Sequence, residues 1–114
     1  MPSSWRLVMD WTEALIAAGE IARQAAIDVP RRLAAKDLTS AEAHELFVAT
    51  ERNAQAMDDL VDRMADDLSL AEAQQKAAEV LRDVWGRLVI AAMNRVRELD
   101  GLPPIEFLGV EEDE

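Results

Sequence analysis

Apolar residues recur every three or four positions along three long stretches of the chain, the spacing of one face of an α-helix. The first predicted helix begins at residue 3 or 4 and runs to about residue 28, the second covers 40–68, and the third covers 69–100. The apolar stripes comprise Val8, Trp11, Leu15, Ala18, Ala22, Ala25 and Val29; Leu46, Thr50, Asn53, Met57, Leu60 and Met64, with Val61 and Leu68 beside them; and Leu70, Ala73, Ala77, Leu81, Val84, Leu88, Ala92 and Leu99, flanked by Trp85 and Val96.

The ends of these helices are marked by capping residues. Thr39-Ser40-Ala41-Glu42 and Ser69-Leu70-Ala71-Glu72 both match the capping box, in which the first side chain and the fourth bond each other's backbone. Pro30 predicts that the first helix ends or kinks near residue 28, with a short helical piece, PRRLAAK, after it. Gly101 suits the left-handed position just past a helix, and Pro103-Pro104 cannot continue one.

Seven-residue spacing of the stripes predicts helices that pack at shallow angles. The second and third helices have almost no loop between them, so we expect a tight antiparallel hairpin. The sequence therefore predicts an all-α fold, an antiparallel three-helix bundle with long helices. Residues 1–101 form the bundle domain, and residues 102–114 form an extended apolar and acidic C-terminal tail.

Two apolar surfaces are present in addition to those that three helices would bury against one another. LVIAAM, residues 88–93, is apolar around the whole helix, and Ile90 points opposite the predicted stripe. The first helix also carries a second stripe beside its main one. Such helices are buried on more than one side. The predicted interaction surface comprises Trp5, Met9, Ile16, Ile90, Met93, Ile105, Phe107 and Leu108.

The tail, GLPPIEFLGVEEDE, contributes the last three of these residues. Its apolar residues follow a stiff Pro-Pro and precede a charged end. Two arrangements remain open: the tail covers the bundle, or it is offered to a groove or sheet edge of a partner. Docking onto residues 88–93, in the same chain or across a dimer, is the favoured arrangement.

The net charge of −11 is unevenly placed. Residues 1–40 carry five basic and five acidic groups, and residues 71–100 are balanced in the same way. The excess lies in residues 41–70 and in the tail. A negative surface argues against direct binding to nucleic acid or to an anionic membrane, because both need Lys and Arg. No stretch is apolar enough to span a membrane.

The stretch DDLVD resembles the DDxxD motif of isoprenoid synthases, whose aspartates hold magnesium against a diphosphate. A helical wheel places Asp58, Asp59 and Asp62 about 100–200° from Met57, outside the apolar stripe. A chain of 114 residues is too short for the deep cavity of those enzymes, and it lacks their second metal motif. The pattern therefore predicts a solvated face of the second helix.

A second spacing, Glu42-x-x-Glu45 followed by Asp59-x-x-Asp62, resembles the ExxE and ExxD motifs of all-helical nucleotide pyrophosphatases. The second motif lacks its Glu. Both pairs lie on one predicted continuous helix, with centres about 20–25 Å apart at 1.5 Å per residue. The metal-ligand candidates are therefore Glu42, Glu45, Asp58, Asp59 and Asp62, but the sequence predicts no metal site and no cofactor.

The chain has no cysteine, one histidine and no phosphate-binding glycine loop, so no catalytic residue is assigned. We expect a cytoplasmic, non-catalytic helical interaction or assembly protein: an adaptor, an assembly factor or a small structural subunit, of the kind found in phages and mobile elements. Its protein partner is unknown, and a homo-oligomer, first of all a dimer, is expected. Two alternatives stay open: a small magnesium-dependent pyrophosphohydrolase-like enzyme, and an acidic inhibitor that mimics DNA.

Overall fold

The computed structural model describes the backbone of residues 3–105 and the side chains of residues 11–105. Three helices make up this part of the chain: α1 (Ser3–Leu33), α2 (Ser40–Ala65) and α3 (Glu72–Leu99). The helices pack against one another without any strand among the described residues, which confirms the predicted all-α three-helix bundle.

Helix α1 runs through Pro30 without interruption and ends at Leu33, so the predicted end near residue 28 is wrong. Proline lacks the N–H that would bond the carbonyl of Ala26, but it can still accept a hydrogen bond. The N–H of Ala34 bonds the Pro30 carbonyl at 3.0 Å. Val29 and Leu33 are buried on either side of the proline, and this packing holds the last turn in place.

Two predicted helix ends are confirmed. At the start of α2, Oγ1 of Thr39 accepts from the N–H of Glu42 at 3.1 Å, and Oε1 of Glu42 accepts from the N–H of Thr39 at 3.0 Å. After α3, Gly101 has a φ of +79°, a conformation that an L side chain rarely adopts. Residues close in sequence thus mark both ends.

The connection between α2 and α3 differs from the prediction. Helix α2 ends at Ala65 rather than Leu68, and Ser69 does not cap α3. Oδ1 of Asp67 accepts from both the backbone N–H and the hydroxyl of Ser69, at 2.9 and 2.7 Å. This local turn competes with continued helix. Helix α3 begins after Ala71, whose N–H bonds Oε1 of Gln74 at 3.2 Å.

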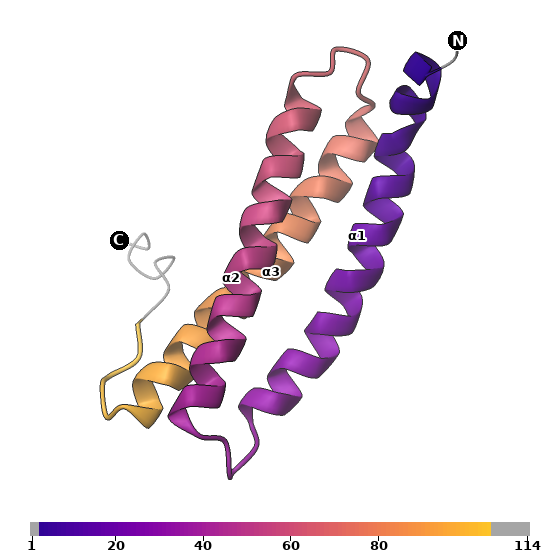
Figure 1. The fold of residues 1–114 in the computed structure, drawn as a ribbon. Coiled ribbons are helices and arrows are strands. Elements are labelled where there is room, and N and C mark those ends of the chain that lie inside the picture. The colour runs from indigo at the N-terminus through magenta and orange to yellow at the C-terminus, as the bar shows by residue number, and fades with distance from the viewer. Residues whose placement is uncertain (1–2, 106–114) are drawn as a thin grey trace.

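The three helices form a flattened layer, and α2 crosses in front of α3 in Figure 1. Helices α2 and α3 form the expected antiparallel hairpin and share the most extensive packing, whereas α1 packs chiefly on α3 and only lightly on α2. The described body measures 57 × 36 × 17 Å, so it is about twice as wide as it is thick. Helix α3 is therefore the helix against which both α1 and α2 pack.

The core lies along the line where all three helices meet. Its buried apolar side chains are Ala22, Val29, Leu33, Ala43, Leu46, Met57, Met64, Ala78, Trp85, Leu88 and Ala92. Four residues of the predicted stripes, Asn53, Leu68, Ala73 and Ala77, are exposed instead. The buried stripe of α3 runs through Ala78 and Trp85, because the large indole fills the space between the diverging α1 and α2.

Polar contacts join α1 to the end of the bundle that contains the α2–α3 turn. Nε1 of Trp11 on α1 donates to Oδ2 of Asp67 in the α2–α3 turn at 2.6 Å. Nε2 of Gln74 on α3 donates to the hydroxyl of Thr12 at 3.0 Å. The backbone and side-chain bonds from Ser69, together with the Trp11 bond, lower the pKa of Asp67 below its ordinary value of 3.8.

Replacing Asp67 with asparagine is therefore expected to destabilise the protein in a pH-dependent way. A lowered pKa means that the ionised carboxylate stabilises the fold above pH 3.8, and that this contribution is lost as the pH falls further. Urea unfolding should show a gap between wild type and Asp67→Asn that is largest above about pH 5 and shrinks toward about pH 3. The neighbouring Asp66→Asn is the matched control. A gap that does not change with pH would contradict the assignment.

Candidate functional site

An apolar groove lies between α1 and α2, where the two helices diverge on one face of the layer. It consists of two adjoining hollows of about 290 and 380 Å³, which share Ile21, Asn53 and Trp85. We call it the α1–α2 groove. Its apolar and small lining residues are Ala14, Ala18, Ile21, Ala25 and Val29 from α1, Leu46, Ala49, Thr50, Ala56, Met57 and Leu60 from α2, and Trp85 from α3.

The shape of the α1–α2 groove follows from the sizes of these side chains. Trp85, only 4% exposed, forms the floor, while alanines on both walls keep the walls low. Ile21 stands on the α1 rim with 56% of its surface exposed. From Ala14 to Arg32 the groove extends along α1 for about 27 Å at 1.5 Å per residue. A surface of this length and composition suits one further α-helix.

Charged side chains stand at the two ends of the α1–α2 groove. Arg63 and Ala14 line one end of the groove. Asp28 and Arg32 line the other end, beside Leu46. Among the described residues, neither Asp28 nor Arg63 forms an ion pair. The middle of the groove is uncharged, so a bound helix would meet charge only at its ends.

The acidic residues of α2 do not line this groove. Glu42, Glu45, Asp58, Asp59 and Asp62 are all exposed on a helix without a break. From Glu42 to Asp59 the axial separation is about 25 Å. Within residues 11–105, no three acidic or histidine side chains gather closely enough to hold a metal ion. The geometry thus does not bring the two acidic pairs together.

Ile90 lines a different hollow, between α2 and α3 on the opposite side of α2 from the α1–α2 groove. This hollow of about 670 Å³ has charged walls that include Glu51, Asp58, Arg82, Asp83 and Arg87. Ile90 and Met93 are half-buried. The structure therefore places Ile90 away from the buried stripe, in a hollow lined by Ala54 and Val89 as well as by side chains of both charges.

The start of the tail folds back on its own chain. The side chain of Asn94 donates to the carbonyl of Ile105 at 3.1 Å and accepts from its N–H at 2.7 Å. Nε of Arg97 donates to the carbonyl of Pro103 at 2.7 Å. Asn94 lies one helical turn beyond Ile90, so residues 102–105 lead toward residues 88–93 in the same chain. Residues 106–114, with Phe107 and Leu108, lie outside the described part.

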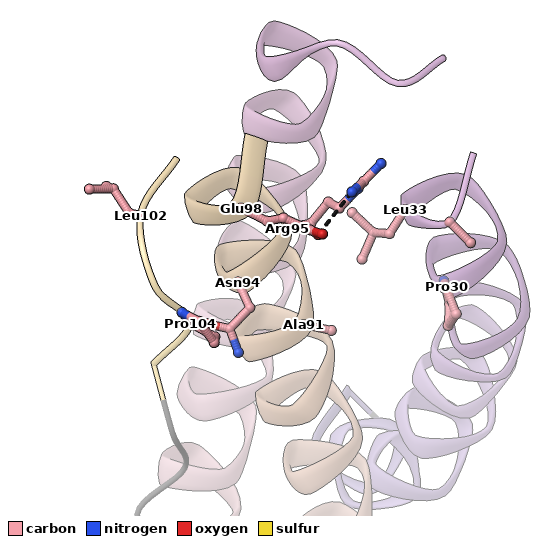
Figure 2. A pocket seen from close by; sticks show the side chains of 9 residues that line it. Pro30, Leu33, Ala91, Asn94, Arg95, Glu98, Leu102 and Pro104 are labelled. Atoms are coloured by element: carbon pink, nitrogen blue, oxygen red, sulfur yellow. Dashed lines mark hydrogen bonds and ion pairs between the residues drawn. The ribbon is translucent and has the colours of Figure 1, made fainter. Parts of the chain in front are cut away.

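A further hollow lies where residues 102–104 meet the ends of α1 and α3 (Figure 2). Pro30 and Leu33 border it on one side, and Leu102 and Pro104 border it on the other. Arg95 projects into it, but its guanidinium is already engaged by Glu98 at 2.9 Å and by the Ala35 carbonyl at 3.3 Å. These contacts give Arg95 a structural role that joins α3 to the α1–α2 loop.

The remaining predicted surface residues are not brought together. Ile16 is 68% exposed and lines a shallow hollow between α1 and α3, with Thr12, Ala73 and Ala77. Trp5 and Met9 lie where side chains are not described. The α1–α2 groove was not predicted, because Ile21 lies outside the predicted stripes and Trp85 was placed only at the flank of the third one. The alanines at 14, 18 and 25 were the available signal, since small residues at helical spacing permit close approach.

No protein-family model, no curated protein and no solved structure matches the chain. None of the helices in the described residues is both long and apolar enough to cross a membrane. Fold and surface together define the chain as an all-α three-helix protein with an open groove between two of its helices.

Proposed function

We propose that this protein is a non-catalytic interaction protein that binds an α-helix in the α1–α2 groove. The observation that carries the proposal is the construction of the groove: a buried tryptophan floor, alanine-rich walls and an exposed Ile21 on the rim. A bound helix would turn the flattened layer into a four-helix arrangement and cover the floor. This is the physics of helix-in-groove recognition, in which apolar anchors enter a preformed surface.

The proposed role is that of a small adaptor or assembly subunit in the cytoplasm, where a cysteine-free helical chain functions without disulfides. Neither alternative role has a specific observation in its favour. A magnesium-dependent hydrolase needs carboxylates that converge, and those of α2 are spread along one helix. A DNA mimic needs its acids along the whole body, whereas α1 and α3 are close to neutral.

Site-specific photocrosslinking tests the proposal. Benzoylphenylalanine placed at Ile21, within the groove, should yield a defined crosslinked protein when the variant is irradiated in its native host. The matched control carries the same group at Val80, which is 60% exposed on α3 and does not line the groove. Crosslinks from position 21 but not from position 80 support the proposal. Equal labelling from both positions, or none from position 21, contradicts it.

A further inference from the structure

We infer that the helix bound in the α1–α2 groove is α1 of a second copy of this chain, in an antiparallel pair centred on Ile21. The inference rests on the proposed function, because it names the occupant of the same groove. In a two-fold dimer of this kind, each α1 lies in the other copy's groove, and both grooves are filled at once.

The groove side of α1 has the composition that such a pair needs. Ala14, Ala18, Ile21 and Ala25 follow one another at steps of three or four residues, and all of them line the groove. When two such helices run antiparallel about Ile21, the two isoleucines meet near the two-fold axis. The alanines then let the backbones approach closely on both sides, while each isoleucine lies above a Trp85 floor.

The same register pairs opposite charges. An antiparallel arrangement centred on residue 21 places position 28 of one copy opposite position 14 of the other. Arg63 lines the groove end beside Ala14, so Asp28 of the second copy arrives at Arg63. The two-fold axis creates this pair twice. Within one chain, Asp28 and Arg63 lie at opposite ends of the groove, about 20 Å apart along α1.

The distribution of charge favours a second copy over a foreign helix. A net charge of −11 opposes self-association in general, but residues 1–40 carry five basic and five acidic groups. Of the acids of α2, Glu51 and Asp58 lie on the side that faces away from the groove, in the hollow that Ile90 lines. An α1–α1 contact therefore brings no excess of like charge together. A basic foreign helix would be attracted to the acidic face of α2 instead.

Disulfide trapping tests the predicted centre of the dimer. The chain has no cysteine, so a single introduced thiol reports only its own contacts. Oxidation of Ile21→Cys should give a covalent dimer of twice the 12.7 kDa chain mass. Ile16→Cys and Val80→Cys are the matched controls, since both positions are at least as exposed but lie off the groove, and they should give no covalent dimer.

Charge reversal tests the register. Asp28→Arg and Arg63→Asp should each weaken dimerisation about tenfold in sedimentation equilibrium, because each places like charges together. The double variant should return to within about threefold of wild type, since the pair is restored with its signs exchanged. Circular dichroism of each variant confirms that the helices are retained.

The two proposals fail in different ways. If the wild-type chain stays monomeric at about 100 µM, a concentration at which even a weak dimer assembles, and Ile21→Cys does not dimerise, the second-copy inference is overturned. The proposed function then still stands when the photocrosslinker at position 21 captures a different protein. Dimerisation without rescue by the double variant also overturns the antiparallel register.

Discussion

Replacing Trp85 with alanine is expected to lower the free energy of unfolding by about 3–5 kcal/mol, the range for removal of a large aromatic side chain from a core. Trp85 is only 4% exposed, yet it contacts the groove walls from both α1 and α2. Its removal leaves a cavity in the core, between α1, α2 and α3. Stabilities of natural domains are about 5–15 kcal/mol, so the variant should lose a large share of its stability.

Urea unfolding followed by circular dichroism measures this loss. Val80→Ala, on the same helix, is the control, because Val80 is 60% exposed and its truncation should change stability by less than about 0.5 kcal/mol. Trp85→Phe keeps an aromatic ring and should fall between the two. Equal midpoints for Trp85→Ala and Val80→Ala would show that the indole does not hold the three helices together.

Met64→Asp is expected to cost about 4 kcal/mol or more, whereas Leu68→Asp should stay within about 0.5 kcal/mol of wild type. Met64 is 1% exposed in the core, so aspartate there removes apolar burial and leaves a carboxylate without a partner. Leu68 is one predicted turn further on, but it is fully exposed because α2 has already ended at Ala65.

The comparison of these two variants by thermal unfolding therefore measures where α2 ends. A helix continuing to residue 68 would place both side chains on the same buried stripe, and both substitutions would then be severe. Similar losses for Met64→Asp and Leu68→Asp would contradict the observed end of α2. A large loss for Met64→Asp alone agrees with it.

Features that depend on neighbouring residues could be predicted from the sequence. The three helices follow from apolar spacing, the Thr39–Glu42 box from two side chains three residues apart, and the Gly101 turn from a single residue. The second capping box failed for an equally local reason. The N–H and the hydroxyl of Ser69 both donate to Asp67, two residues earlier. The capping-box pattern begins at Ser69, so it does not include residue 67.

Features that depend on which helices touch could not be predicted. A helical wheel gives α3 one apolar stripe, but it does not say that α1 and α2 would both pack on α3 and only lightly on each other. That arrangement turns Trp85 toward the space between them and leaves Ala73 and Ala77 exposed. The α1–α2 groove exists only because α1 packs chiefly on α3 and only lightly on α2. The spacing of apolar residues along the chain does not indicate which helices pack against each other.

The two bonds between Asn94 and Ile105 bear on how this protein tolerates sequence change. Both bonds go to the backbone of residue 105, so its side chain can vary without loss of the contact. Position 94 is different, because the contact needs a donor and an acceptor on one short side chain, and aspartate would set a carboxylate oxygen against the Ile105 carbonyl. Substitutions at one helical residue thus decide whether residue 105 stays bound to α3, whatever side chain residue 105 carries.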